Sequence, residues 1–436
     1  MKILVVGGGG REHAIIKKLL QSKTPLEIYA SPGNGGIGCD AVCTGIAATD
    51  IDGVVAFSKQ NKIDYVVVAP DDPLVLGMVD CLEKEGIPAF GPRKAAAIIE
   101  GSKAFSKDLM KRYNIPTAAY EVFDNSDRAI KYVKKMNKYP VVIKADGLAL
   151  GKGVLISENE KDAVAAITDI LDGNKFGASG SRVVIEEFLA GKEVSVLSFT
   201  DGKTIVPMVS SMDHKRAHDG DTGLNTGGMG AVAPNPYYTE EIAAECMETI
   251  FLPTIEAMNK EGRTFKGCLY FGLMLTPDGP KVIEYNCRFG DPETQVVLPL
   301  LRGDLLEIFM ATTNGTLDKV DFGFDGGAAA CVIIASGGYP EKYEKGKTIF
   351  GLNNMGSSDK ADVIVYHAGT KKQGDELVSA GGRVLGVTAT ASTLKKALDK
   401  AYDAARDIGF EGSFMRNDIG KSALSAIKQE GENGCF

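Results

Sequence analysis

The first hundred residues alternate short apolar runs with segments whose apolar side chains recur on one helical face, and no other feature constrains the fold as strongly. The run at residues 2–6 ends in four consecutive glycines, and the helical periodicity begins at Glu12. Runs this short and apolar are typical of strands buried on both faces of a parallel sheet. The pattern predicts strands at residues 2–6, 26–30 and 65–69 and helices at 52–60 and 74–85. A doubly wound parallel sheet follows from that order.

The rest of the chain mixes helices and strands, so we assign it to the α/β class as an α+β multidomain chain. The 436 residues correspond to about three domains. Residues 115–117 resemble a hinge, residues 322–327 a linker and residues 430–436 a frayed tail. The expected strands lie at 141–145, 153–156, 183–187, 194–199, 269–276, 281–285, 328–335, 363–367 and 383–390, and the expected helices at 240–260, at 392–407 and after a cap at Ser126.

The charge balance is acidic, with 49 Lys and Arg against 57 Asp and Glu and a net charge of −8. This balance argues against a broad nucleic-acid-binding surface, although it is compatible with a local basic pocket for a phosphate. No uncharged stretch approaches about 18 residues and no signal-peptide core is present, so we expect no membrane span and no signal peptide. The eight cysteines and four histidines show no zinc spacing, and we expect reduced core thiols in a cytoplasmic protein.

The glycines at residues 7–10 lie between a predicted strand and a predicted helix, where backbone N–H groups can bind an anion. A dinucleotide site would need an acidic residue at the end of the second strand. That strand ends in Ala30-Ser31-Pro32 instead, which argues against a nicotinamide cofactor. Two interpretations of the glycines remain. They could bind a small phosphorylated ligand together with Pro32-Gly33-Asn34, or they could form a tight turn without a ligand.

A second glycine-rich loop runs from Lys144 to Gly153 and leads from one strand directly into another. A Walker loop would lead into a helix instead. The loop has the form of a mobile hairpin lid, in which glycines let the backbone close over phosphates while Lys144 and Lys152 neutralise them. The alternative is a surface hairpin with incidental lysines, but Lys144 lies where a buried strand needs a reason for a charge.

The segment from Glu284 to Arg288 offers the strongest local evidence for a site. Alternate side chains of an extended segment share a face, so Glu284, Asn286 and Arg288 are expected to project together. Glutamate and asparagine supply the oxygen ligands that Mg²⁺ prefers, and arginine can bind a carboxylate or a phosphate through two parallel hydrogen bonds. The alternative is an exposed strand face with a salt bridge.

Two further segments carry polar groups whose role the residues alone leave open. Glu186 and Glu187 end an apolar strand and could accept hydrogen bonds from an adenine and a ribose, but such a pair is more often a solvated strand end. Residues 213–230 mix charges with glycines, as either a ligand clamp or an ordinary surface loop would.

Segments spread along the whole chain carry a family resemblance. They are GGGGREH at 7–13, PGNGG at 32–36, EGSKAFSKDLM at 100–110, IPTAAY at 115–120, KADGLALGKGV at 144–154, DHKRAHDGDTGLNTGGMGAVAP at 213–234, EYNCRFGDPETQ at 284–295, HAGTK at 367–371 and GGRVLGVTA at 381–389. Together, though not singly, they resemble the ATP-grasp superfamily and, within it, the phosphoribosylamine–glycine ligases.

The resemblance implies a domain organisation. It comprises an N-terminal Rossmann-like domain (1–100), an ATP-grasp large subdomain (101–120 and 192–325), an ATP-grasp small or lid subdomain (121–191), a mixed β/α C-terminal domain (326–428) and a tail (429–436).

The resemblance also implies a reaction. ATP would phosphorylate the carboxylate of glycine, and the amine of 5-phosphoribosylamine would attack the acyl phosphate to give glycinamide ribonucleotide, ADP and phosphate. The expected cofactor is Mg²⁺ or Mn²⁺, with ATP as co-substrate. The expected partners are small molecules, with no nucleic acid and no membrane, and the expected state is a cytoplasmic monomer or weak dimer.

The resemblance also implies roles for the residues at the family's functional positions. The ATP site would use Lys103, Lys144, Gly151, Lys152, Gly153, Glu186, Glu187, Leu189 and Glu193, and the metal site Glu284 and Asn286. The amine substrate would contact Gly9, Gly10, Asn34, Asp72, Asp213, Lys215 and Asn225. Arg288 would bind glycine or the transferring phosphate, and Arg288, Lys144 and Lys152 would be catalytic.

Three departures from the family pattern stand out. The usual glutamate after the third major strand is replaced by the pair Asp71-Asp72, either of which could reach the substrate. Residues 267–276 carry no carboxylate for a second metal ion, and Leu224 stands where proline is common. An ATP-grasp ligase with a different acceptor remains the nearest alternative. A non-catalytic nucleotide-binding module is less compatible with an intact Glu284, Asn286 and Arg288.

Overall fold

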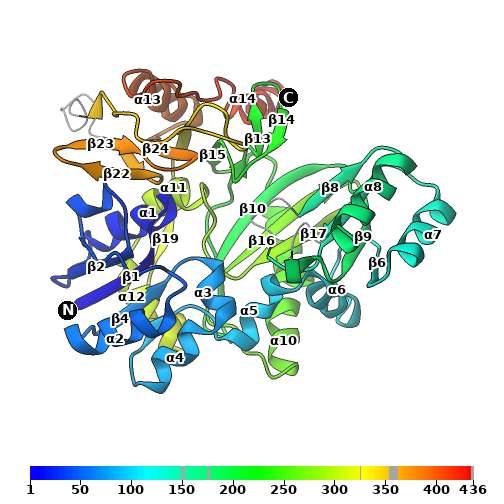
Figure 1. Ribbon diagram of the computed structural model, residues 1–436, viewed down its shortest axis with the longest axis horizontal. Coiled ribbons are helices and arrows are strands. Elements are labelled where there is room, and N and C mark those ends of the chain that lie inside the picture. The colour runs from blue at the N-terminus through cyan, green and yellow to red at the C-terminus, as the bar shows by residue number, and fades with distance from the viewer. Residues whose placement is uncertain (149–152, 174–176, 325, 353–361, 434–436) are drawn as a thin grey trace.

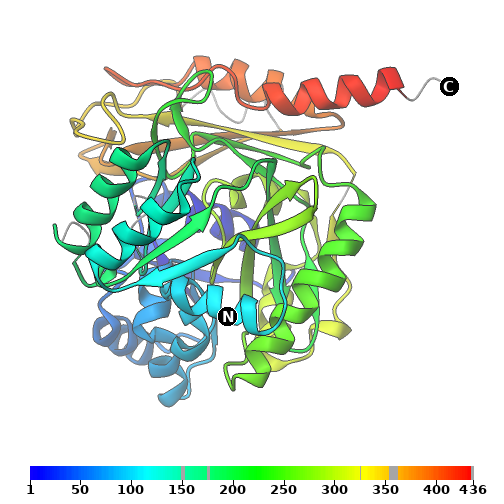
Figure 2. The ribbon, with the colours of Figure 1, turned by 90° about the vertical axis from the view of Figure 1, so that its right-hand side faces the viewer.

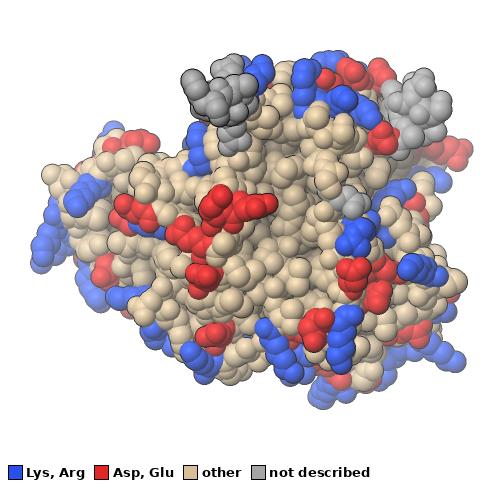
Figure 3. All heavy atoms as spheres, turned by 180° about the vertical axis from the view of Figure 1, so that it is seen from behind, with Lys and Arg blue, Asp and Glu red and all other residues tan. Residues whose placement is uncertain are grey.

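The computed structural model describes residues 1–148, 153–173, 177–324, 326–352 and 362–433, and for residues 178 and 430–433 it describes the backbone alone. In Figure 1 the N-terminal sheet lies at the lower left and the C-terminal strands lie above it. The lid lies at the right, and the strands β10, β16 and β17 run between these parts. Figure 2 shows the C-terminal helices lying across the top of the molecule. Figure 3 shows the face opposite to that of Figure 1, where basic and acidic side chains are interspersed.

The N-terminal sheet is parallel, as the alternation predicts, with the strand order β3-β2-β1-β4-β5. Its strands are β1 (Lys2–Gly7), β2 (Glu27–Pro32), β3 (Val42–Cys43), β4 (Tyr65–Val68) and β5 (Ala89–Phe90), and α1 (Gly10–Leu19) and α2 (Ile51–Asn61) connect them. Leu4 and Val6 belong to one hydrophobic cluster and Ile3 and Val5 to another, so both faces of β1 are buried. This burial explains why the strand is apolar throughout.

The helix expected at residues 74–85 is instead two helices, α3 (Asp71–Leu76) and α4 (Met78–Lys84). They meet at Gly77, whose φ of 100° lies in the left-handed region that glycine tolerates and other residues avoid. The first helix begins earlier than predicted, and Asp71 and Asp72 therefore lie in its first turn.

The part of the chain predicted as the lid contains an antiparallel sheet in the order β6-β9-β7-β8, covered by two helices. The strands are β6 (Tyr120–Phe123), β7 (Val141–Ala145), β8 (Val154–Ser157) and β9 (Val183–Glu187), and the helices are α7 (Ser126–Met136) and α8 (Glu160–Leu171). The predicted cap was wrong by one residue. Asn125 caps α7 by accepting a hydrogen bond from the backbone N–H of Arg128, and Ser126 is the first helical residue.

The part predicted as the large subdomain contains the sheet β11-β10-β16-β17. Its strands are β10 (Lys192–Thr200), β11 (Ile205–Pro207), β16 (Gly267–Thr276) and β17 (Gly279–Asn286), and its helices include α6 (Lys103–Arg112), α11 (Thr294–Val297) and α12 (Leu305–Asn314). Helix α5 (Lys94–Gly101) precedes α6, at the end of the predicted N-terminal domain. The helix predicted at 240–260 is present as α9 (Glu240–Cys246), a π-helical turn (Met247–Phe251) and α10 (Leu252–Lys260). The widened turn ends two residues before Pro253, which has no N–H to donate to the preceding turn.

The C-terminal sheet has the order β12-β15-β20-β24-β21 and takes two of its strands from residues far upstream. The strands are β12 (Met212–Asp213), β15 (Gly230–Ala233), β20 (Ala328–Ala335), β21 (Val363–His367) and β24 (Arg383–Ala391), with α13 (Leu394–Arg406) against them. Between β12 and β15 lies the hairpin of β13 (Arg216–His218) and β14 (Thr222–Asn225), and β22 (Thr370–Gln373) pairs with β23 (Glu376–Ser379).

Two expectations about irregular segments differ in part from the structure. The predicted linker at 322–327 contains β19 (Gly323–Phe324), which pairs with β18 (Leu301–Arg302). The tail expected to fray from residue 430 continues α14 (Lys421–Asn433) as far as Asn433. Residue 325 of the linker and residues 434–436 of the tail lie outside the described residues.

The cysteines differ in part from the expectation of core thiols. Cys246, Cys268, Cys287 and Cys331 are buried, whereas Cys39, Cys43 and Cys81 are exposed, and all seven are free. No helix among the described residues combines the length and apolar character that crossing a membrane requires.

Candidate active site

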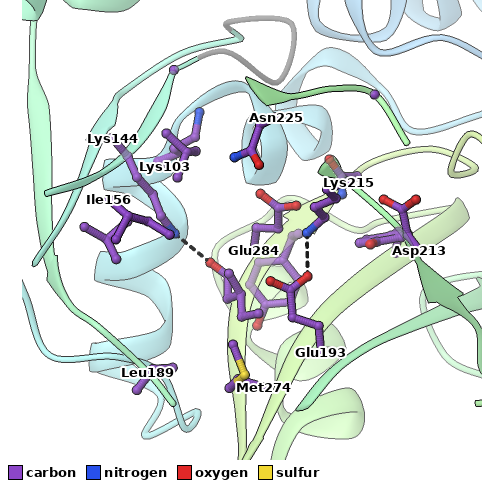
Figure 4. Close-up of a pocket in the computed structure, with 18 of the residues that line it drawn as sticks. Lys103, Lys144, Ile156, Leu189, Glu193, Asp213, Lys215, Asn225, Met274 and Glu284 are labelled. Carbon is purple, nitrogen blue, oxygen red and sulfur yellow. Dashed lines mark hydrogen bonds and ion pairs between the residues drawn. The ribbon is translucent and has the colours of Figure 1, made fainter. Parts of the chain in front are cut away.

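A cavity of about 610 Å³ is lined by side chains from the lid, from β10, β16 and β17, from helices α3, α5 and α6, and from the segment around the β13–β14 hairpin. Figure 4 shows how its charged groups lie. Lys103 and Lys144 lie on one side, Lys215 and Asp213 lie on the other, and Glu284 lies between them. The cavity therefore brings together residues from most of the segments that carry the sequence motifs.

The end of β17 supplies Glu284, Asn286 and Arg288, and all three line the cavity as the alternating pattern predicts. The register of β16 and β17 shifts at Ile283, because Leu273 pairs with Val282 while Gly272 pairs with Glu284. This bulge leaves Val282 in the hydrophobic core and turns Glu284 toward the cavity. Regular alternation then holds from Glu284 onward.

Glu284 is surrounded by positive charge without being the ion-pair partner of the nearest lysines. Burial alone would raise its pKa, but the charges of Lys215, Lys144, Lys103 and Arg288 outweigh burial and lower it. The lysines Lys144 and Lys215 pair instead with Glu186 and Glu193. Glu284 is thus an ionised carboxylate whose oxygens face the cavity.

A buried group of charges lies beside this strand end. Glu186 lies 3.0 Å from the Nζ of Lys144 and 2.9 Å from the Nζ of Lys107, and all three side chains are almost fully buried. Lys107 also donates a hydrogen bond to Thr117, and Lys144 donates one to the carbonyl of Ile283. Burial lowers the pKa of Lys107 to about 8, although Glu186 opposes that shift. Sequence reasoning named Lys144 and Glu186 but missed Lys107, which lies within the quoted motif at residues 100–110.

The lid residues are described in part. Gly153 lines the cavity, and Lys103 donates a hydrogen bond to the carbonyl of Gly147. The predicted residues Gly151 and Lys152 lie outside the described residues.

The segment expected to contact adenosine lines the cavity with Glu186, Glu187, Leu189 and Glu193. Its carboxylates already have partners, however. Glu187 accepts a hydrogen bond from the backbone N–H of Ala119, and Glu193 pairs with Lys215 at 2.8 Å. The structure therefore assigns Glu186 and Glu193 a role in holding lysines, which the sequence did not indicate.

Arg288 is held by two carboxylates from the N-terminal part of the chain. Its Nη2 lies 3.2 Å from Glu100 and 3.8 Å from Asp71. Burial would lower the pKa of Arg288, but these two acids outweigh it and raise the pKa above its ordinary value. Its Nε is buried and has no hydrogen-bond partner among the described residues, so this N–H is available to a ligand. Glu100 received no predicted role from the sequence, although it begins the motif at residues 100–110.

The two neighbouring aspartates Asp71 and Asp72 differ in their position relative to the cavity. Asp71 lines the cavity, whereas Asp72 does not belong to its lining. The turn of α3 directs Asp71 toward Arg288. Substrate contact by Asp72 stays a prediction.

The glycine loop at residues 7–10 lies next to the cavity but outside its lining. The N–H of Gly9 donates to Glu12, and a side chain at Gly10 would meet Gln295. Asn34 is occupied internally, because its amide donates to the carbonyls of Gly8 and His367. Asn34 therefore joins two loops, and contact of Gly9, Gly10 and Asn34 with the substrate stays a prediction.

The opposite end of the cavity has Asp213, Lys215 and Asn225 in its lining, as expected, together with Glu293. Burial and the neighbouring charge of Glu293 raise the pKa of Asp213 well above its ordinary value. Asp213 Oδ1 is buried and lacks a hydrogen-bond partner among the described residues. These two acids form a tightly coupled buried pair that favours at least one protonated carboxyl.

Among the described residues, no group of three or more His, Cys, Asp or Glu side chains is placed to hold a metal ion. The pair Glu284 and Asn286 supplies one carboxylate and one amide oxygen on the same strand face. Such a pair fits Mg²⁺ or Mn²⁺ when phosphate oxygens complete the coordination. β16 offers no second carboxylate, and Met274 lines the cavity instead.

Three family models match consecutive parts of the chain. They are described as the N domain, the ATP-grasp (A) domain and the C domain of phosphoribosylglycinamide synthetase, and they match residues 1–100, 101–294 and 329–422. The chain belongs to the phosphoribosylglycinamide synthetase family. Family membership confirms the ATP-grasp resemblance and the α/β fold class.

Relatives of the phosphoribosylglycinamide synthetase family match over almost the full length. The phosphoribosylamine–glycine ligase of Halalkalibacterium halodurans is 48% identical over 425 residues, which cover 98% of either chain. A crystal structure of the phosphoribosylamine–glycine ligase from Thermotoga maritima, 33% identical, superposes with a TM-score of 0.83 and covers 96% of this chain and 100% of that one.

A more distant likeness concerns the fold alone. The biotin carboxylase domain of the Hydrogenobacter thermophilus 2-oxoglutarate carboxylase, solved with magnesium ADP and bicarbonate, superposes with a TM-score of 0.70 at 17% identity, covering 95% of this chain and 91% of that chain. Enzymes with the ATP-grasp fold use ATP together with divalent metal ions. A phosphoribosylglycinamide synthetase family chain is accordingly an ATP-dependent ligase.

Proposed function

We propose that this enzyme ligates glycine to 5-phosphoribosylamine at the expense of ATP, through a glycyl phosphate, and releases glycinamide ribonucleotide, ADP and phosphate in purine biosynthesis. The observation that carries the proposal is the single cavity in which Lys103, Lys144 and Glu284 face Asp213 and Lys215. Its lining extends from the lid to the β13–β14 hairpin, so a nucleotide would bind at the lid end and a phosphorylated amine at the hairpin end. The names of relatives 48% identical over nearly the whole chain support the same reaction.

The nucleotide would bind between the lid and β17. Lys103 and Lys144 would neutralise the phosphate oxygens, with Lys152, Gly151 and Gly153 contributing from the lid loop. Leu189 and Glu187 would contact the adenosine. Phosphoryl transfer needs positioning and charge neutralisation more than covalent help, and buried lysines supply both.

Glu284 and Asn286 would hold the divalent ion, either Mg²⁺ or Mn²⁺. The low pKa of Glu284 keeps the carboxylate ionised and ready to bind a cation. When bound, the ion would neutralise charge on the phosphate oxygens. The amide of Asn286 would orient the same oxygens from the next cavity-facing position of the strand.

Arg288 would bind the glycine carboxylate or the phosphate transferred to it, with Glu100 and Asp71 fixing its guanidinium. In the first step, a carboxylate oxygen of glycine would attack the γ-phosphorus of ATP, and ADP would leave. The amine of the second substrate then attacks the glycyl carbonyl carbon, phosphate leaves, and one amine proton is lost. Asp213, Lys215 and Asn225 would hold this amine substrate, while Gly9, Gly10 and Asn34 would shape the loop beside it.

The experiment mixes purified enzyme with ATP, Mg²⁺, glycine and freshly prepared phosphoribosylamine and measures ADP. ADP release that needs both glycine and the ribosylamine supports the proposal. ADP release that is indifferent to either substrate contradicts it, and turnover with glycine and another amine would indicate a different acceptor.

A second measurement tests the acyl phosphate itself. Glycine labelled with oxygen-18 in its carboxylate should transfer one label to inorganic phosphate in each turnover, because the carboxylate oxygen that attacks ATP leaves with the phosphate. Phosphate without the label would exclude a glycyl phosphate intermediate.

The enzyme is further proposed to act in the cytoplasm as a monomer or weak dimer. The free exposed thiols Cys39, Cys43 and Cys81 support a reducing compartment. Cell fractionation and the molar mass from light scattering test the two statements separately.

A further inference from the structure

The β13–β14 hairpin carries part of the proposed amine site but has almost no hydrophobic support of its own. Arg216, Asp221 and Asn225 line the cavity, and every residue of β14 is exposed. Ala217 is the buried apolar residue of β13. A two-stranded hairpin is only marginally stable by itself, so its position depends on contacts made by other segments.

Arg416, which follows the C-terminal sheet in the chain, makes the densest set of these contacts. Its Nη1 donates to the carbonyl of Arg216 at 3.1 Å and to the carboxylate of Asp221 at 2.8 Å. Its Nε and Nη2 bind both oxygens of Asp418 at 2.8 and 2.9 Å. The side chain is only 1% exposed, so these hydrogen bonds replace water around a fully buried charge.

Neighbours of Arg416 in sequence bind the same hairpin. Asp219, at the turn, accepts hydrogen bonds from the backbone and the side chain of Asn417 at 2.7 and 3.1 Å. The N–H of Gly220 donates to Asp418 at 2.8 Å. Upstream of the hairpin, His214 accepts a hydrogen bond from the N–H of Gly420 at 3.0 Å. Residues 416–420 therefore hold the hairpin along its length.

The far end of the segment is held by a second arginine, Arg383, which lies in β24 of the C-terminal sheet. Arg383 Nη1 donates to the carbonyl of Gly227 at 2.6 Å and to that of Asp291 at 2.8 Å. Tyr339 accepts a hydrogen bond from the N–H of Gly227 at 3.1 Å. The segment between Asp213 and Gly228 is thus fixed at its middle by Arg416 and at its end by Arg383.

We propose that Arg416 is a positioning residue for the amine substrate: it holds the β13–β14 hairpin against the C-terminal segment so that Asp213, Lys215 and Asn225 stay at the cavity. The proposal rests on the proposed function for the identity of the substrate. Arg416 contacts the hairpin rather than the ligand, because it does not belong to the cavity lining. Its effect must therefore pass through the hairpin.

The test compares Arg416→Met with Asp219→Ala and with a matched control. Asp219 is exposed, lies outside the cavity lining and contacts Asn417, so its truncation loosens the hairpin without touching a ligand. The control is Lys395→Met, which removes an exposed ion pair with Asp399 on α13 of the same domain. Hydrogen exchange of the hairpin amides and the KM values for all three substrates are measured for each variant, together with Tm.

For Arg416→Met we expect hairpin exchange and the KM for phosphoribosylamine to rise by about tenfold or more, while the KM for ATP changes by less than about threefold. Asp219→Ala should raise hairpin exchange and the KM for phosphoribosylamine by about threefold each. Lys395→Met should change neither of these two quantities. A general structural defect would raise all KM values together. Arg416→Lys should recover part of the loss, since an ammonium keeps the charge but not the forked geometry.

Faster hairpin exchange with an unchanged KM for phosphoribosylamine in Asp219→Ala would overturn the positioning role. Unchanged hairpin exchange in a folded Arg416→Met enzyme would overturn the anchoring itself. If Arg416→Met does not fold, Asp219→Ala decides alone. Failure of the proposed function has a different signature, because the wild-type enzyme would then show no glycine-dependent turnover while the exchange results still stood.

Discussion

Replacing Lys107 by methionine tests the buried charge group behind the cavity. Methionine fills a similar volume, so the substitution removes the ammonium without opening a large cavity. The ammonium is 2.9 Å from Glu186 and 2.8 Å from the hydroxyl of Thr117. Its loss leaves a carboxylate that is 4% exposed with Lys144 as its remaining cation, at 3.0 Å.

The magnitude follows from what remains around Glu186. Breaking a buried ion pair and leaving one charge alone costs about 3–5 kcal/mol. A single charge-assisted hydrogen bond contributes about 1.5–3 kcal/mol. Because Lys144 stays in place, Glu186 keeps one cation, so the smaller of these two ranges applies. We therefore expect Lys107→Met to lower the free energy of unfolding by about 2 kcal/mol.

Urea denaturation without nucleotide measures the effect, with Lys111→Met on the exposed side of α6 as the matched control. The control should change the free energy of unfolding by less than about 0.5 kcal/mol. The double variant Lys107→Met with Glu186→Gln is the decisive measurement. It removes the stranded carboxylate, so it should be less destabilised than the sum of the single variants by about 1 kcal/mol or more.

Additive losses, within about 0.5 kcal/mol, would refute the argument that an uncompensated charge causes the effect. If Lys107→Met lowered the free energy of unfolding no more than Lys111→Met does, that result would also refute it. Either result would mean that water or a relaxed side chain satisfies Glu186 after the substitution.

Three further predictions concern the metal pair, the arginine at the strand end and the response to acid. Glu284→Gln should lower kcat by about 100-fold or more and raise the Mg²⁺ requirement, and wild-type rates at limiting Mg²⁺ would contradict this. Glu100→Gln keeps the shape but replaces the carboxyl group 3.2 Å from Arg288, a group whose pKa is raised by burial despite Arg288. Its kcat should fall by about 5–30-fold, and unchanged steady-state kinetics would exclude the role. Burial lowers the pKa of His214 to about 4. Between about pH 6.5 and 4, His214 is therefore protonated in the unfolded chain but neutral in the folded chain. The free energy of unfolding should fall by up to about 3 kcal/mol as the pH is lowered through this interval. Urea titrations of His214→Gln should show a shallower fall, and an identical pH profile would count against it.

Local sequence patterns anticipated most secondary structure in this chain. The apolar runs marked β1, β2 and β4, and the strands at 141–145, 183–187 and 328–335 have the boundaries that the pattern predicted. These successes share a cause, since burial on one or both faces leaves a periodicity that is visible without tertiary information. The errors occurred where a single residue determines a helix boundary. Gly77 divides the helix predicted at 74–85, and Asn125 rather than Ser126 caps α7.

The candidate site was predicted less completely. Glu284, Asn286 and Arg288 share the cavity because a two-residue spacing on a strand is a local property. Asp71 rather than Asp72 reaches the cavity, and Asn34 joins two loops, because the helix start and loop packing were not visible in the sequence. The site roles of these residues, like the predicted domain boundaries, stay predictions.

The sequence by itself determined the order of strands and helices, the ordered set of motifs and, through them, the family. Tertiary structure alone decided which charges meet. Glu100 pairs with Arg288, Lys107 with Glu186, and Arg416 with a hairpin 200 residues earlier in the chain. Local periodicity reports whether a side chain is buried, but a buried charge can be satisfied by any partner that the packing of distant elements brings within about 3 Å.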